Sequence, residues 1–93
     1  MSEKASAFIR ITGRVQMVGY RFFTQQWAED FYLDGWVRNN PDGSVSAEVE
    51  GKKTTIEKLI TELKQGPRIA SVDEVDVKWG PFKKRFRGFR IKY

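Results

Sequence analysis

The sequence contains no cysteine and no histidine among its 93 residues. Without cysteine there can be no disulfide framework, no thiolate nucleophile and no thiolate metal site. Without histidine, the commonest general base and metal ligand is also missing. Any chemistry must therefore use arginine, lysine, asparagine, carboxylates and backbone groups. The lack of cysteine also fits a reducing compartment.

Long hydrophobic runs are missing as well. Residues 1–6 are polar, and no stretch approaches the ~20 apolar residues that span a bilayer, so we expect neither a signal peptide nor a membrane segment. A chain of 93 residues is long enough for one core but too short for a two-domain cleft. We therefore predict one cytoplasmic, monomeric domain over residues 1–93, with a flexible segment at residues 1–5.

Basic residues outnumber acidic ones, which gives a formal net charge of +5 and a pI near 9.7. This balance favours anionic partners, such as phosphorylated metabolites, nucleic acid or an acidic membrane surface. Charge alone does not choose among them.

Hydrophobic periodicity divides the chain into strands and helices. Apolar residues alternate over residues 7–15, which predicts a half-buried strand. From Arg21 to about Leu33 the period changes, and Phe23, Trp27 and Phe31 form the inner stripe of a helix. A strand is predicted next over 35–40, then a turn at Asn40–Gly43 and a strand over 44–50. A helix follows, from a capping box at Thr54–Glu57 to Gly66-Pro67. The last elements are a strand around 75–79, with Val72 out of phase either before it or at a bulge, and a closing strand over 89–93.

This order is β-α-β-β-α-β with an added C-terminal strand. It predicts an α+β fold, the ferredoxin-like split β-α-β sandwich, in which two helices cover one face of an antiparallel sheet of four strands plus the C-terminal strand. Glu48 and Glu50 alternate with apolar residues and should lie on the wet face of the sheet. The run Lys83–Arg87 is typical of a solvated edge strand and its connecting loop.

The loop between the first strand and the first helix has the character of an anion pocket. Gly13 and Gly19 bracket a segment that can turn its backbone N–H groups toward one point, next to a helix N-terminus. Arg21 lies in the first turn of that helix, where a positive charge opposes the helix dipole, and no acid follows before Glu29. A bound phosphate would supply the missing negative charge.

Asn39 should lie near Arg21 in this fold. The first two strands run parallel with the third between them, so the end of the second strand and the loop leaving the first share one edge of the sheet. Asn39 lies two residues after the inward-facing Val37 and therefore on the same face. Its neutral amide can both donate and accept, which suits holding a water beside a bound anion.

Two segments resemble the signatures of the acylphosphatase family. One signature matches at every specified position: Gly35-Trp36-Val37-Arg38-Asn39, three residues, Gly43-Ser44-Val45, five residues, Gly51. The other is met by Ile11, Gly13, Val15, Gln16, Val18 and Arg21. It departs at Met17, where the family usually has glycine, and at Tyr20, where it has Phe or Met. If residue 17 needs a positive φ, methionine adds strain of about 1–2 kcal/mol.

The resemblance implies hydrolysis of acyl phosphates, the mixed anhydrides of a carboxylic acid and phosphate, without a metal, a cofactor or a covalent intermediate. Carried over by position, Arg21 and the loop amides would hold the phosphoryl oxygens, and Asn39 would position the attacking water. The loop residues concerned are Gln16, Met17, Val18, Gly19 and Tyr20. The implied partners are a small-molecule acyl phosphate and inorganic phosphate, as product or inhibitor, with no membrane; nucleic acid is not the partner that the resemblance favours.

Two other functions remain open at this point. Arg87-Gly88-Phe89 begins like an RNA-binding motif of ferredoxin-like domains, but Arg90, Ile91 and Lys92 do not continue it. The second alternative keeps the fold but not the enzyme. In it, the domain is a catalytically weak phosphate sensor or interaction module, since fold does not fix function.

Overall fold

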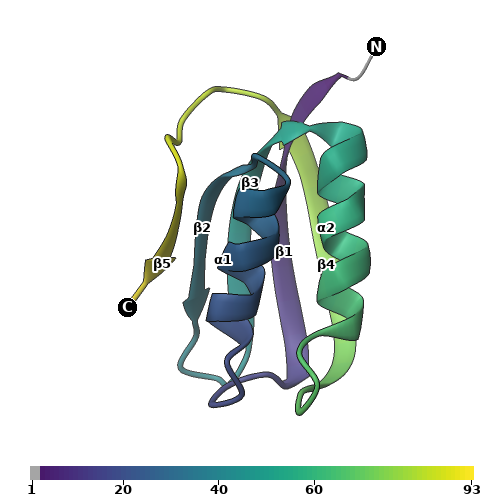
Figure 1. Ribbon diagram of the computed structural model, residues 1–93, viewed down its shortest axis with the longest axis vertical. Helices are drawn as coiled ribbons and strands as arrows, with labels where there is room; N and C mark the ends of the chain where they lie inside the picture. Colours follow the sequence, from purple (N-terminus) through teal and green to yellow (C-terminus); the bar gives the residue numbers. More distant parts are fainter. Residues whose placement is uncertain (1–2) are drawn as a thin grey trace.

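The computed structural model of the protein describes residues 3–93 as one sheet with two helices packed on one of its faces (Figure 1). In chain order the elements are β1 (Lys4–Arg14), α1 (Tyr20–Asp30), β2 (Asp34–Asn39), β3 (Val45–Lys52), α2 (Lys53–Gln65), β4 (Ser71–Pro81) and β5 (Phe89–Lys92). The strands lie in the order β4-β1-β3-β2-β5. The predicted ferredoxin-like fold is confirmed.

Strand directions bring the ends of β1 and β2 to one edge, as predicted. β3 pairs antiparallel with both β1 and β2, so these two strands run in the same direction. β5 pairs parallel with β2 and forms one edge of the sheet. The loop after β1, the start of α1 and the ends of β2 and β5 therefore gather at one end of the molecule, the lower end in Figure 1.

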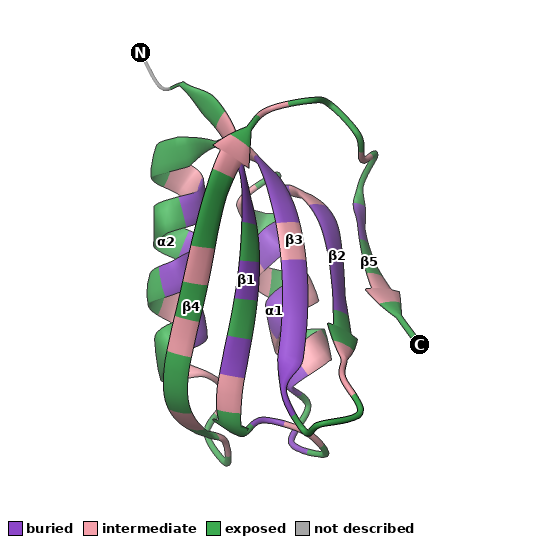
Figure 2. Ribbon diagram, turned by 180° about the vertical axis from the view of Figure 1, so that it is seen from behind, coloured by how far each residue is buried: buried purple, intermediate pink, exposed green. Residues whose placement is uncertain are grey.

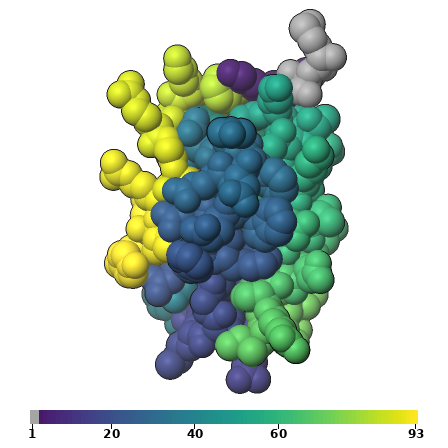
Figure 3. Space-filling model, viewed as in Figure 1, coloured from purple at the N-terminus to yellow at the C-terminus, as the bar shows by residue number. Residues whose placement is uncertain are grey.

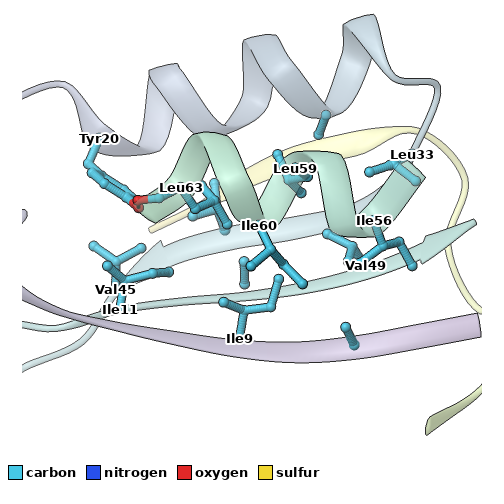
Figure 4. Close-up of a cluster of buried hydrophobic side chains, with 14 of the residues drawn as sticks. Ile9, Ile11, Tyr20, Leu33, Val45, Val49, Ile56, Leu59, Ile60 and Leu63 are labelled. Carbon is cyan, nitrogen blue, oxygen red and sulfur yellow. Dashed lines mark hydrogen bonds between the residues drawn. The ribbon is translucent and has the colours of Figure 1, made fainter. Parts of the chain in front are cut away.

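The core lies between the sheet and the helices. α2 buries Ile56, Leu59, Ile60 and Leu63 against inward side chains of the central strands such as Ile9, Ile11, Val45 and Val49 (Figure 4). Burying each of these large side chains stabilises the fold by about 1.5–3 kcal/mol. Figure 2 shows the same division from behind, with β3 mostly buried and β4 mostly exposed along the sheet edge.

The most deeply buried face of α1 differs from the aromatic stripe predicted for it. Tyr20, Thr24 and Ala28 are the buried residues of the helix. Phe23, Trp27 and Phe31 flank them, partly buried and packed against the core, with the rings of Trp27 and Phe31 stacked at 5.3 Å. Thr24 tolerates burial because its hydroxyl donates to the carbonyl of Tyr20 at 2.9 Å.

A bulge interrupts the pairing of β1 with β4 at Val72, the second of the two placements predicted for this residue. The register shifts between Thr12 and Gly13, so that Gly13 pairs with Val72. Gly13 has a φ of 123°, and a Cβ built there would lie 2.2 Å from the carbonyl oxygen of Ser71. Only glycine fits this close approach of two backbones.

Two predicted helix boundaries were wrong. α1 ends at Asp30 instead of near Leu33, because Tyr32 adopts a φ of 56°. The N–H groups of Tyr32 and Leu33 then donate back to the carbonyls of Glu29 and Ala28 at 3.0 and 2.9 Å. These are the hydrogen bonds of a Schellman motif, with tyrosine where glycine is usual.

The capping box predicted at Thr54–Glu57 does not open the second helix. α2 already begins at Lys53, with Lys52 as N-cap and no side-chain cap hydrogen bond. The N–H of Lys53 donates to the carbonyl of Glu3 at 2.8 Å instead. The backbone preceding β1 therefore supplies the cap.

Glu50 was predicted on the wet face of the sheet, but its side chain is only 1% exposed. The segment between β4 and β5 covers it, and the N–H groups of Lys83 and Arg85 donate to its two carboxylate oxygens at 2.9 and 2.7 Å. The guanidinium of Arg85 lies 3.5 Å from the same carboxylate and 2.5 Å from Glu48. The Lys83–Arg87 run is thus anchored by this acid pair, which sequence periodicity could not show.

The first strand begins earlier than predicted. Lys4 and Ala5 belong to the segment for which we predicted flexibility, yet they pair with Lys52 and Gly51 at the end of β3. Residues 1–2 of that segment lie outside the described residues.

Candidate functional site

A pocket of about 250 Å³ opens where the loop after β1 meets α1, β2 and β5. We call it the α1 pocket. Its lining residues are Val15, Met17, Gly19, Tyr20, Arg21, Phe22, Asn39, Ile91 and Tyr93. Both predicted catalytic side chains, Arg21 and Asn39, are therefore present in one pocket. In Figure 3 the C-terminal residues lie directly beside α1 at this end of the molecule.

Arg21 is the second residue of α1 and has no carboxylate partner. None of the ion pairs within residues 3–93 includes it, and the first turn of the helix contains no acid. Its guanidinium lies over the ring of Tyr93, 4.8 Å from the ring centroid. The ring orients the cation by a cation–π contact and leaves its charge to be neutralised by a ligand.

The backbone before Arg21 presents unused donors. Gly19 caps the helix in the left-handed conformation, with a φ of 76°, and its carbonyl accepts from the N–H of Phe23 at 3.0 Å. In residues 3–93, the backbone hydrogen bonds outside helices and strands include none donated by residues 16 to 22. A helix start with free N–H groups, next to a cation, is a favourable environment for a phosphate.

Residue 17 has a positive φ, which is the condition under which we predicted strain at Met17. Its φ is 62°, and its side chain is 99% exposed. The left-handed conformation costs a non-glycine residue about 1–2 kcal/mol. The methionine therefore fits the loop without a steric clash in the core, but under backbone strain.

Gln16 and Val18 do not line the α1 pocket. Val18 is buried in the core, and the side-chain amide of Gln16 points across to the turn after β2. There it donates to the carbonyls of Asn40 and Ser44 at 2.7 and 2.9 Å. Gln16 thus ties the loop to the turn that follows Asn39, a positioning role that the sequence alone did not suggest.

Tyr20 contributes backbone to the pocket while its side chain points into the core. Its hydroxyl donates to the carbonyl of Leu63 at 2.6 Å, near the end of α2. Burial raises the pKa of Tyr20 well above its ordinary value, so the phenol stays protonated as a donor. The departure from the family's Phe or Met is therefore accommodated, because the added hydroxyl has a partner.

Asn39 reaches the pocket from the last residue of β2. Within the described chain its side chain makes no hydrogen bond, so its amide is available to a ligand or a water. The adjacent strand β5 pairs with β2 in the register Val37 to Ile91, which brings Tyr93 beside Asn39. We did not predict Tyr93; the parallel pairing of β5 with β2 was the missing information.

The turn after Asn39 is held by its own polar side chains. Asp42 accepts from the N–H and the hydroxyl of Ser44 at 3.0 and 2.6 Å and from Arg10 at 2.6 Å. The hydrogen bonds from Ser44, followed by that from Arg10, lower the pKa of Asp42 to about 2. The carboxylate therefore stays ionised at neutral pH as a structural acceptor in the turn.

Acidic metal-binding clusters and membrane-spanning helices are both absent from residues 3–93. Residues 3–93 contain no group of three or more acidic side chains that could hold a metal ion. Neither helix in this range is long and apolar enough to cross a membrane.

Comparison with known proteins assigns the family. The acylphosphatase family model matches residues 7–91. An acylphosphatase of Salinibacter ruber is 49% identical over 83 residues, covering 89% of this chain and 87% of the relative. One of Thermus thermophilus is 44% identical, covering 87% and 91%. The crystal structure of acylphosphatase from Bacillus subtilis superposes with a TM-score of 0.93 at 31% identity, covering 96% and 99%. The chain therefore belongs to the acylphosphatase family.

Proposed function

We propose that the α1 pocket hydrolyses acyl phosphates to a carboxylate and inorganic phosphate, with the reacting phosphoryl group bound to Arg21 and to the backbone N–H groups of the loop 16–20. In this mechanism Asn39 positions the attacking water. The observation that carries the proposal is the Arg21 guanidinium without an ion-pair partner, which shares one pocket with Asn39 and with a helix start that no side chain caps.

The electrostatics of the pocket suit phosphoryl transfer. The charge that develops in the transition state is spread over the phosphoryl oxygens, so catalysis depends mainly on positioning and neutralisation. Arg21 supplies a full positive charge, and the first turn of α1 supplies free N–H donors. Because neither is already neutralised, both are available to the phosphoryl oxygens without breaking an internal contact.

The reaction needs no strong base from the protein. Water attacks phosphorus, the bond from phosphorus to the bridging acyl oxygen breaks, and its electron pair leaves on the carboxylate. The proton released by the water goes to an oxygen of the phosphoryl group itself. Asn39 accepts a hydrogen bond from the water through its side-chain carbonyl and can donate to a phosphoryl oxygen through its NH₂ group.

Two positioning contacts support this geometry. The Tyr93 ring holds the Arg21 guanidinium from one side. Gln16 links the phosphate-binding loop to the turn after Asn39. Together they fix the distance between the group that binds the anion and the group that positions water, which is what in-line attack requires.

The family assignment supports an enzyme over the alternatives. Curated relatives that share 44–49% of their residues with this chain are named acylphosphatases. The phosphate sensor and the RNA-binding module have no comparable support. We further propose that the enzyme is cytoplasmic and monomeric. We also propose that it is independent of metal ions, since the pocket itself contains a cation in Arg21 and the described chain has no acidic cluster for a metal.

A hydrolysis assay with benzoyl phosphate in the presence of EDTA tests the reaction class and the metal requirement together. We expect turnover that EDTA does not reduce and that inorganic phosphate inhibits competitively. No turnover by the folded protein, or turnover restored only by a divalent cation, would contradict the proposal. Gel filtration with light scattering at the assay concentration tests the monomer.

A further inference from the structure

A second and larger pocket, of about 460 Å³, lies at the opposite end of the sheet. We call it the far pocket. It lies where β1 and α2 begin and where α1 and β3 end, under the segment 82–88 that arcs from β4 to β5 at the upper end of Figure 1. Its volume is within the range of small-molecule sites. None of its lining residues lines the α1 pocket.

Four basic side chains line the far pocket: Lys4, Lys52, Lys84 and Arg87. None of them takes part in an ion pair within residues 3–93. The only acidic side chain of the lining is Asp34, which already accepts from the N–H of Gly88 at 2.9 Å. Four basic groups and one acid give the lining a formal charge of +3. The neighbouring Arg85, in contrast, is paired with two carboxylates.

Aromatic rings form the apolar part of the same lining. They are Phe31, Tyr32, Phe82 and Phe86. Tyr32 is 92% exposed and is held at a φ of 56°. A strained, solvent-exposed aromatic residue gains nothing from core packing, and strain of this kind is concentrated at functional sites. Lys84 also has a positive φ, of 52°.

Buried Glu50 fixes the arrangement of the segment above the pocket. The N–H groups of Lys83 and Arg85 point toward the Glu50 carboxylate. The side chains of the alternate residues, Phe82, Lys84 and Phe86, line the pocket. The rings and cations therefore lie on a backbone that is anchored at Lys83 and Arg85. Because this backbone is already ordered, ligand binding costs less conformational entropy.

We infer that the far pocket binds a nucleoside diphosphate, with the base stacked among the aromatic rings and the phosphates bound to Lys4, Lys52, Lys84 and Arg87. A diphosphate carries about −3 near neutral pH, since its terminal phosphate contributes about −2. This charge matches the +3 of the lining. Base–aromatic stacking accounts for rings that an inorganic anion would not use.

The chemistry of the far pocket favours binding without hydrolysis. Its lining contains no asparagine comparable to Asn39. In its covering segment the N–H groups of Lys83 and Arg85 donate to Glu50 and are not available to a ligand. The pocket thus has charge and rings but lacks the water-positioning amide of the α1 pocket.

Isothermal titration calorimetry on the Arg21→Gln variant tests the inference, because this substitution removes the anion site of the α1 pocket. ADP, inorganic diphosphate and adenosine are titrated separately at constant ionic strength without divalent cations. We expect one ADP site, with diphosphate and adenosine each at least about tenfold weaker. Diphosphate binding as tightly as ADP would overturn the role of the rings.

Charge variants then locate the site. On the Arg21→Gln background, Lys52→Gln with Lys84→Gln should weaken ADP at least about tenfold. Lys58→Gln with Lys64→Gln changes the net charge equally on the exposed face of α2 and should leave ADP binding within about twofold. Equal affinity in both double variants, or no ADP binding at all, would overturn the inference. Because binding is measured without the α1 pocket, either result leaves the proposed hydrolysis standing.

Discussion

The two ends of this molecule each contain a pocket with positive charge, but different groups supply and surround that charge. At the α1 pocket one arginine, Arg21, is combined with free backbone donors and an amide, Asn39. At the far pocket four basic side chains and four aromatic rings line one cavity, and the N–H groups of Lys83 and Arg85 in the covering segment donate to Glu50. The first arrangement suits a small tetrahedral anion that backbone can enclose. The second suits a longer ligand that side chains reach from several sides.

The comparison shows that unbalanced charge alone does not make a catalytic site. Both pockets adjoin the start of a helix with no acid in its first turn. Only the α1 pocket combines its cation with unpaired N–H groups and an amide that can hold a water. Binding and turnover should therefore respond differently when residues are changed at the two ends.

The largest effect is expected from Arg21→Gln. The fold should be retained, because Arg21 makes no ion pair or hydrogen bond in residues 3–93. Benzoyl phosphate hydrolysis should fall by about 10³-fold or more, as for other arginines that stabilise phosphoryl-transfer transition states. Arg68→Gln, an exposed arginine in neither pocket, is the matched control. Equal turnover in the two variants would refute the role of Arg21.

Asn39→Ala should separate binding from turnover. If the amide positions water, kcat should fall by about 10²-fold because the attacking water loses its orientation. The inhibition constant for inorganic phosphate should change by less than about threefold, since Arg21 and the loop remain. Steady-state kinetics with phosphate as inhibitor measure both quantities. A loss of phosphate binding as large as the loss of kcat would make Asn39 a binding group instead.

Glu50→Gln should weaken the anchor of the segment above the far pocket. Replacing the carboxylate by an amide removes hydrogen bonds to a charged group and should cost about 1.5–3 kcal/mol, which urea unfolding at pH 7 would measure. Burial alone would raise the pKa of Glu50, but hydrogen bonds from Lys83 and Arg85 and the Arg85 charge hold it below its ordinary value.

The depressed pKa gives this prediction a pH dependence. The stabilisation by the Glu50 carboxylate is complete above the unfolded pKa of about 4.3 and is lost as pH falls through the folded pKa. The difference in unfolding free energy between the wild type and Glu50→Gln should therefore shrink below about pH 4. Glu57→Gln, an exposed residue of α2, is the control and should show little difference at either pH. A gap for Glu50→Gln that stays constant down to pH 2 would contradict the assignment.

Met17→Gly should stabilise the protein by about 0.5–1 kcal/mol. Glycine relieves the strain of a φ of 62°, and only part of this gain is offset by its greater freedom in the unfolded chain. Thermal unfolding measures the gain. Turnover of the same variant shows whether the methionine displaces the N–H groups of the loop. A destabilised variant would mean that Met17 makes contacts that offset its strain.

The smallest effect is expected from Tyr32→Gly, which should raise the free energy of unfolding by about 0.5 kcal/mol. Glycine is the usual residue of a Schellman motif and relieves the strain of a φ of 56°, while its greater freedom in the unfolded chain offsets part of the gain. Hydrolysis of benzoyl phosphate should be unchanged, and ADP affinity should fall. Stabilisation with unaltered ADP binding would remove Tyr32 from the proposed base site.

Sequence reasoning predicted the fold and the meeting of Arg21 with Asn39, because both follow from periodicity and from the handedness of β-α-β connections. It missed contacts that depend on how distant segments lie in space. Tyr93 reaches Arg21 only because β5 pairs parallel with β2. Glu50 is buried only because the segment before β5 folds over it. The alternation of apolar and polar residues along a strand predicts neither the contact of Tyr93 with Arg21 nor the burial of Glu50.

Local signals also failed where tertiary contacts competed with them. The threonines of 54–57 look like a cap, yet the carbonyl of Glu3 caps Lys53 instead. Tyr32 ends α1 although no glycine marks the position. In α1 the predicted inner stripe was aromatic and did not include Thr24 and Ala28, whose small side chains permit the closest approach to the core.

The most direct test of the account is a phosphate titration of the protein labelled with ¹⁵N and followed by NMR. We predict saturable shifts of the backbone N–H groups of residues 17–21 and of the Arg21 side chain, and the loss of these shifts in Arg21→Gln. Phosphate-dependent shifts confined to other residues, or shifts that persist in Arg21→Gln, would contradict the claim that this arginine and the helix start without a side-chain cap form the phosphate site.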